Sequence, residues 1–175
     1  MNRLEYWLKS WTGHNLHSPW MFRFYNDVLA SGMPEEYRGN RELREAGRGR
    51  RATAELIYKT MNYFGYERVT VMGTDAQLPP WAQRGNARSV FVEREADLLV
   101  VPYSGEDKQP QIRQVGIRKG GMIIVERPHA DRLREVWWNG LYDEFLPVVS
   151  VDMYDVGMLI FREGLHPQKF ILRQE

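Results

Sequence analysis

The sequence predicts a single α/β domain whose sheet is mostly parallel. Short runs rich in apolar and β-branched residues alternate with amphipathic helical segments, which favours βαβ units. One of these runs, residues 97–101, is almost entirely apolar, as is typical of a strand covered on both faces. The length of 175 residues fits one domain with a substantial core.

Residues 1–50 are expected to form a helical prefix that packs on the body of the domain, residues 51–175. Fifty residues bury too little surface to make a separate core. A first helix places four apolar residues at the i, i+3, i+4 and i+7 positions of one face: Leu4, Trp7, Leu8 and Trp11. Trp7 and Trp11, together with Trp20, are expected in the core. The alternative is an exposed aromatic patch that binds a partner.

A second helix is predicted to begin at Ser18, a typical N-cap residue, with Pro19 at the first helical position. The polar residues 34–46 predict a further helix, and residues 48–51 a basic link. A third amphipathic helix, over residues 56–64, precedes the first strand.

Four strands are expected, each in a short apolar or β-branched run: residues 68–72, 89–93, 97–101 and 122–126. A polar helical stretch is expected at residues 109–115. The next helix carries its apolar residues on one face: Leu133, Val136, Trp137, Leu141 and Phe145. Residues 148–153 and 157–162 then predict a C-terminal antiparallel hairpin, and residues 170–173 an edge segment.

Composition excludes several kinds of site. The chain has no cysteine, which removes disulfides, thiolate zinc sites and cysteine nucleophiles. A net charge of +1 does not indicate a nucleic-acid partner. No apolar run approaches the roughly 20 residues of a membrane span, and no signal peptide is recognised. We therefore expect a cytoplasmic protein without a membrane or nucleic-acid partner.

The densest basic run contains six arginines: Arg38, Arg41, Arg44, Arg48, Arg50 and Arg51. Glu42 and Glu45 interleave with them at helical spacing, which is typical of a solvated helix face. The alternative is a surface that binds phosphate or RNA.

The segment His14-Asn-Leu-His17-Ser-Pro-Trp20 resembles the His-Gly-Val-His-Ser-Pro-Phe signature of a class I S-adenosylmethionine-dependent methyltransferase-like family known from Bacteroidetes. The likeness resumes at residues 55–64 and is strongest from residue 122 to the C-terminus. The resemblance implies a Rossmann-like methyltransferase fold, with S-adenosylmethionine over the carboxyl ends of the first strands. It also implies that the closing hairpin lies at one edge of the sheet.

The cofactor loop departs from the pattern of that family, which is Glu-Leu-Gly-Thr-Ser-x-Gly. Gly73 and Thr74 match, but Met72 replaces the acidic residue. The second glycine, which would let the backbone approach the ligand, is lost. Pro79 and Pro80 remove two backbone N–H donors. The interval between Gly73 and residue 97 holds one convincing strand where the family has room for two, so one βα unit is shrunken or deleted.

The resemblance assigns cofactor binding to Gly73, Thr74, Asp75 and Glu93, and places Tyr103 or His129 near the methyl acceptor. The spacing of twenty residues from Gly73 to Glu93 is that of a nucleotide loop followed by an acidic ribose ligand. The plainer alternatives are a strand-end turn with a surface glutamate, an Asx-turn at Asp75, and a loop histidine at position 129.

Three further histidine and metal hypotheses follow from the same segments. Glu126 could orient His129 as a general base. His14 and His17 either face a substrate or fix the prefix to the body. No metal site is expected, because Arg127 is a poor neighbour for a cation.

The expected function is that of a methyltransferase-like protein with a degenerate S-adenosylmethionine site. The sequence leaves its activity open, and an active form would transfer a methyl group to an oxygen or nitrogen nucleophile. The alternative is a non-catalytic domain that binds a protein partner or a second copy of itself.

Overall fold

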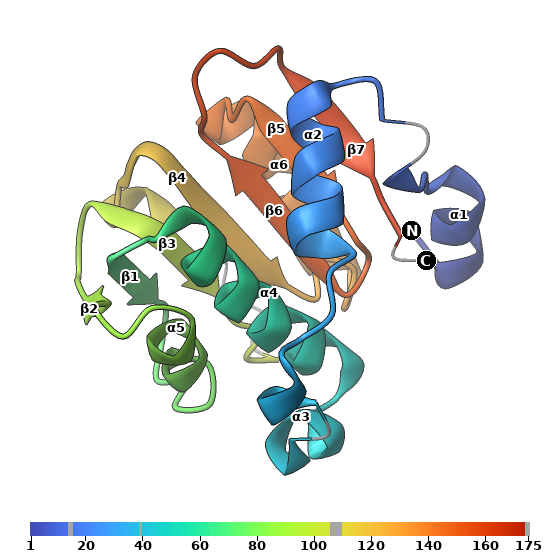
Figure 1. Ribbon diagram of the computed structural model, residues 1–175. Helices are drawn as coiled ribbons and strands as arrows, with labels where there is room; N and C mark the ends of the chain where they lie inside the picture. The colour runs from blue at the N-terminus through green and yellow to red at the C-terminus, as the bar shows by residue number, and fades with distance from the viewer. Residues whose placement is uncertain (14–15, 39, 106–109, 174–175) are drawn as a thin grey trace.

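The protein is built on a seven-stranded mixed sheet (Figure 1). The computed structural model describes residues 1–13, 16–38, 40–105 and 110–173. In spatial order the strands are β2 (Val90–Phe91), β1 (Arg68–Val71), β3 (Ala96–Val101), β4 (Ile117–Glu126), β6 (Val156–Ile160), β5 (Val149–Asp152) and β7 (Gln168–Ile171). Strand β6 is antiparallel to β4 and β5, and the other pairings are parallel. The prediction of an α/β fold with a mostly parallel sheet and an antiparallel hairpin is confirmed.

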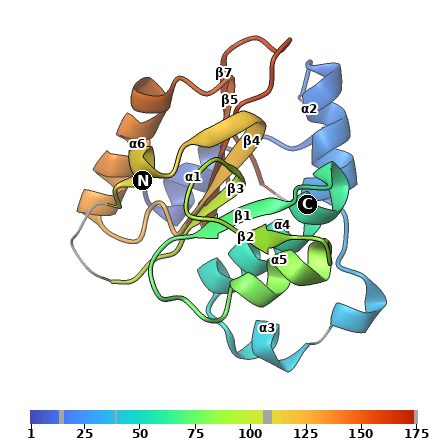
Figure 2. The same ribbon diagram turned by 90° about the vertical axis from the view of Figure 1, so that its left-hand side faces the viewer.

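Helices cover both faces of the sheet (Figure 2). In chain order the helical segments are α1 (Arg3–Lys9), α2 (Pro19–Phe24), η2 (Tyr25–Leu29), η3 (Glu35–Tyr37), α3 (Arg41–Glu45), α4 (Arg48–Phe64), α5 (Pro79–Gly85), η4 (Ile112–Gln114) and α6 (Arg132–Phe145). Helices α2, α4 and α5 pack with side chains such as Leu98 and Val100, and α6 packs with Leu99 and Val101. The alternation along β3 follows from the two-residue period of a strand.

Helix α4 begins earlier than the sequence predicts. Residues 48–51 form its first turn and not a link. Arginine favours helices, and this turn is held by tertiary contacts that sequence spacing does not reveal. The helix ends at Gly65, whose φ of 65° is the left-handed conformation that glycine adopts without strain.

Two other boundaries differ from expectation. Strand β4 starts at Ile117, so Gly120 and Gly121 lie inside it. Tyr66 reaches over this part of the strand and donates a hydrogen bond of 2.7 Å to the Gly120 carbonyl. Only residues 110–115 of the expected helix at 109–115 are described, and they contain the single turn η4.

The closing hairpin is not at the edge of the sheet, contrary to what the resemblance implies. Strand β7 pairs in parallel with β5 on the outer side, so the hairpin of β5 and β6 lies between β4 and β7. The C-terminal segment supplies this extra strand because its backbone fills the free edge of β5.

The prediction of a single strand between Gly73 and residue 97 is confirmed, and this strand, β2, lies at the edge of the sheet opposite β7. Strand β2 has two residues, and only residues 92–95 join it to β3. A parallel crossover normally needs a dozen residues or more, usually with a helix. Arg68 fastens this short link by donating to the carbonyls of Glu95 and Arg94 at 2.8 and 3.1 Å.

The expected burial of the first helix is wrong. Its apolar stripe faces solvent, with Leu4 69%, Trp7 58% and Leu8 70% exposed. Trp11, which is 50% exposed, lies beyond the end of the helix and pairs with Leu172. The opposite face contacts the body through polar groups: Arg3 pairs with Asp155 at 2.7 Å, and the Tyr6 hydroxyl donates to the Leu172 carbonyl. These contacts set the rotation of the helix. Trp20 is partly buried and stacks on Phe24, with ring centroids 5.1 Å apart.

The predicted face of α6 is correct only in part. Trp137, Trp138 and Leu141 are buried, whereas Leu133 and Val136 are exposed. Trp138 fits against Gly157 of β6 so closely that a Cβ there would lie 2.5 Å from the indole ring. Across the described ranges, no helix is both long and apolar enough to cross a membrane.

Candidate functional site

The strand order places a potential site at the carboxyl ends of β1, β3 and β4. The chain runs outward from β1 to β2 and then crosses to β3 on the other side of β1. Such a reversal opens a crevice outside the strand ends in doubly wound sheets. Gly73, Thr74 and Asp75 follow β1, Tyr103 follows β3, and the end of β4 lies beside them.

Arg50 occupies the centre of this edge. Its guanidinium pairs with Asp75 through Nη1 and with Glu126 through Nε, the latter at 3.2 Å from Glu126 Oε1. The side chains of Arg50, Asp75 and Glu126 are 21%, 12% and 3% exposed. One cation from the first turn of α4 therefore joins the loop after β1 to the end of β4.

Asp75 has a second structural role. Its Oδ1 accepts hydrogen bonds from the backbone N–H groups of Gln77 and Leu78, at 2.9 and 3.0 Å. These bonds form an Asx-turn that leads into α5. Gly73, with a φ of 76°, supplies the left-handed residue that lets the loop turn. Both oxygens of Asp75 are thus engaged within the protein.

Glu126 is a buried carboxylate whose charge has two partners. Its Oε2 accepts a hydrogen bond of 2.8 Å from the backbone N–H of Tyr103, and Arg50 pairs with Oε1. Burial raises the pKa of Glu126, because a carboxylate loses solvation there, while the Tyr103 bond and Arg50 partly offset this.

Two arginines lie close to the ring of Tyr103. The guanidinium groups of Arg127 and Arg134 lie 4.6 and 5.8 Å from the centre of its ring, and its hydroxyl lies 3.3 Å from Asp131 Oδ2. Arg127 also lies against Gly49 of α4, where a Cβ would come within 2.2 Å of its Cγ. Tyr103 is therefore at the predicted edge but in a crowded setting.

Arg134 braces the ends of β3 and β4 from the α6 side. Its Nη2 donates to the carbonyls of Val101 and Pro102 at 3.2 Å and of Glu126 at 3.1 Å. Burial lowers the pKa of Arg134 to about 10. These carbonyls are the free acceptors that a strand end presents, and here one side chain satisfies them.

His129 lies beyond the end of β4 but does not pair with Glu126, so the expected couple of those residues is wrong. Its Nε2 is 2.7 Å from Asp152 Oδ2, and its ring stacks on Tyr154 with centroids 5.3 Å apart. Trp138 Nε1 donates to the same Asp152 oxygen at 3.1 Å. The side chain of His129 is 2% exposed, which leaves it without direct access to a ligand.

Glu93 and Thr74 are exposed. Glu93 lies two residues after β2, which puts it at the same edge as Gly73 on the neighbouring strand. The glycine and the acidic residue of the nucleotide pattern are therefore at the same edge of the sheet. Glu126 ends the strand β4 at this edge, and Arg50 pairs with it. Among the described residues, no group of three or more His, Asp or Glu side chains is arranged to hold a metal ion.

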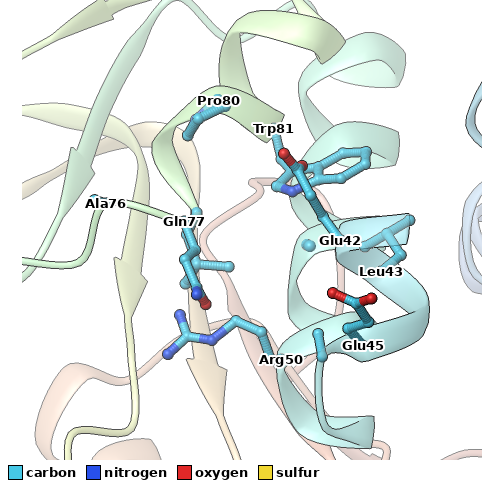
Figure 3. A pocket seen from close by; sticks show the side chains of 11 residues that line it. Glu42, Leu43, Glu45, Arg50, Ala76, Gln77, Pro80 and Trp81 are labelled. Carbon is cyan, nitrogen blue, oxygen red and sulfur yellow. The ribbon is translucent and has the colours of Figure 1, made fainter. Parts of the chain in front are cut away.

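A pocket of about 360 Å³ lies on the other side of the loop, between α3, α4 and α5 (Figure 3). Glu42 and Glu45 project from α3, and Arg50 points toward Gln77 across the opening. Trp81 forms part of its wall. Gly73, Thr74, Asp75 and Glu93 do not line this pocket.

Sequence reasoning missed Arg50 as a site residue and assigned it to a solvated face. The missed signal was its position in the first turn of the helix that precedes β1, since such a side chain can reach the carboxyl edge of the sheet. Comparison of the sequence with protein-family models and with curated proteins finds no match. The resemblance to methyltransferase-like proteins therefore stays an expectation.

We predict that Arg50→Met lowers the free energy of unfolding by about 3 kcal/mol or more, because Glu126 is left buried without its cation. Urea denaturation measures this. Arg51→Met is the matched control, since Arg51 pairs with Glu55 at the surface and its loss is expected to cost under about 1 kcal/mol. Equal losses in the two variants would contradict a structural role for the Arg50 bridge.

We further predict a pH signature of Glu126. Because the pKa of Glu126 is raised, the folded protein holds this proton more tightly than the unfolded chain does. The contribution of the protonated Glu126 to folding stability is therefore complete below the unfolded-state pKa, and it is lost as the pH rises through the folded-state pKa. The free energy of unfolding of the wild type, relative to Glu126→Gln, should fall from about pH 4 toward neutrality.

Glu5→Gln provides a control of opposite sign for the Glu126 experiment. The hydrogen bond from Lys9 lowers the pKa of Glu5, so the contribution of Glu5 to stability grows as the pH rises. A wild-type advantage over Glu126→Gln that increases with pH would show that pairing with Arg50 outweighs burial.

Proposed function

We propose that this chain is a methyltransferase-like domain whose S-adenosylmethionine site is degenerate and no longer supports methyl transfer. The strand order supports the first half of this proposal. Strands β2, β1, β3 and β4 stand in the 2-1-3-4 order of a doubly wound sheet, with its switch point between β1 and β3. The antiparallel β6 beside β4 accords with the hairpin of the resembling family, whereas β7 outside β5 departs from it.

The ion pairs of Arg50 with Asp75 and Glu126 support the second half of the proposal, which is that the cofactor site is degenerate. A cofactor over the ends of β1 and β3 would compete with a cation that already pairs with Asp75 and Glu126. Displacing it leaves Glu126 buried and unpaired, at a cost of about 3 kcal/mol or more. A micromolar ligand has roughly 8 kcal/mol of binding free energy, so this cost alone weakens its binding about a hundredfold.

The short link between β2 and β3 adds to this loss. Residues 92–95 leave no room for the strand and helix that would wall an adenine ring. The exposed Glu93 has no such neighbour to complete a ribose and base site.

Calorimetric titration with S-adenosylmethionine and S-adenosylhomocysteine tests this proposal. We expect no saturable binding below about 1 mM, because both the Arg50 bridge and the missing unit oppose it. Protein with a cooperative unfolding transition serves as the control for correct folding. Micromolar binding of either compound would contradict the proposal, and oxygen and nitrogen acceptors would then be screened with Tyr103 and His129 variants.

The exposed stripe of α1 favours a second function, self-association. Leu4, Trp7 and Leu8 form an exposed apolar face of α1, and monomeric proteins rarely expose large apolar patches. The stripe continues to Trp11, whose backbone pairs with Leu172 next to the outermost strand β7. A second copy would bury this face as the apolar centre of an interface, which needs about 800 Å² per partner.

We predict that the protein sediments as a dimer at high micromolar concentration and that Trp7→Ser with Leu8→Ser weakens this association tenfold or more. Each large apolar side chain contributes about 1.5–3 kcal/mol when buried. Sedimentation velocity over a concentration series measures the effect. Phe22→Ser, on the exposed face of α2, is the matched control. A wild type that stays monomeric throughout would remove this function.

A further inference from the structure

A second cavity lies at the opposite edge of the sheet, where strands β5 and β7 begin. It has a volume of about 480 Å³ and is formed by the segment leading into α2, the start of β5, and the loop between β6 and β7. Figure 1 shows the amino end of α2 beside this loop. The cavity shares no residue with the Arg50 network, which lies at the carboxyl ends of the parallel strands.

Four of the polar side chains that line this cavity can donate hydrogen bonds into it. His17 and Arg23 come from the prefix, and His166 and Gln168 come from the far side. No carboxylate lines it. Within the described part of the chain, His17, Arg23 and His166 have no hydrogen bond or ion pair of their own. Three side chains able to carry positive charge thus meet around one space without an internal counter-charge.

The surroundings strengthen this positive character. The guanidinium of Arg162 lies over the Trp20 ring, 5.6 Å from its centre, and Trp20 is one wall of the cavity. Glu163, in the same loop, pairs with Lys119 at 2.8 Å and is not among the lining residues.

Apolar walls complete the cavity. Trp20, Val149 and Leu165 line it beside the donors, and Pro19 adds to them. The volume is far larger than a bare inorganic anion needs and lies within the range of small-molecule sites. A ligand that suits both parts has an anionic head and an apolar organic body. Two imidazoles and a guanidinium offer enough donors and charge for a phosphate dianion, and so they suit a ligand with a phosphate better than a ligand with a single carboxylate.

We propose that this cavity binds a small organic phosphate. The phosphate contacts His17, Arg23 and His166, and the organic part lies against Trp20 and Leu165.

The site gives a role to the His17-Ser18-Pro19 segment that the proposed function does not use. Ser18 accepts the Met21 N–H as the N-cap of α2, and Pro19 starts the helix. This fixed helix start holds His17 at the rim. His14, the other histidine of the motif, lies outside the described residues.

Titration with phenyl phosphate tests the proposal. Inorganic phosphate and phenol, which represent the anionic and the apolar part of this compound, are titrated separately. We expect phenyl phosphate to bind more tightly than either of them. In NMR spectra of the wild-type protein, the resonances of the Trp20 indole and of the His17 and His166 rings should shift during the titration.

Variants separate a built site from general charge. Arg23→Gln and His166→Gln should each weaken binding about tenfold, as expected for a lost charge-assisted hydrogen bond. Arg94→Gln changes the net charge as Arg23→Gln does but lies in the link between β2 and β3, and should leave binding within about twofold. All three side chains are exposed, so the variants should fold.

Two results would overturn the proposal. One is equal weakening by Arg94→Gln and Arg23→Gln, which indicates attraction to overall charge. The other is absence of saturation and of a Trp20 shift at about 10 mM phenyl phosphate. Neither result bears on the titration with S-adenosylmethionine, because the two sites lie at opposite edges of the sheet.

Discussion

The ion bridge made by Arg50 is the constraint on which the rest of the carboxyl edge depends. Its partners come from segments far apart in the chain: Asp75 follows β1 and Glu126 ends β4. A buried carboxylate is tolerated only when its charge is matched and hydrogen-bonded. The position of α4, the turn into α5 and the end of β4 are therefore coupled through one guanidinium.

This coupling accounts for the crowding at the edge where doubly wound sheets bind ligands. Arg134 satisfies the carbonyls at the ends of β3 and β4, and Tyr103 lies between Arg127 and Arg134. These side chains and the carbonyl groups at the strand ends contact one another. The two-residue strand β2 and its short link lie at the same side of the sheet, next to β1.

Two surface features of the protein lie outside the Arg50 network. Helix α1 is fastened by Arg3 and Tyr6, and so presents its apolar stripe outward. At the far edge, His17, Arg23 and His166 surround a cavity without a carboxylate. Both features belong to the prefix and the C-terminal strands, where the sheet has been extended by β7.

The sequence by itself determined the fold class, the order of the main elements and the presence of a single strand between Gly73 and residue 97. Those properties follow from local periodicity and chain length, which a single sequence displays. The loop residues Gly73 and Asp75 were also found at the expected strand end, because strand ends are marked by turn residues. None of these predictions requires that a segment of the chain be stable in isolation.

Only the tertiary structure decided which side of α1 is buried, which partner His129 takes, and where Arg50 points. Apolar spacing marks a helix face but not its rotation, and polar contacts from Asp155 and Leu172 turned that face of α1 outward. Asp152 and Asp75 lie 23 and 25 residues from His129 and Arg50 along the chain. Electrostatic partners across such separations are chosen by packing of the whole domain, and their strength depends on burial that the sequence does not display.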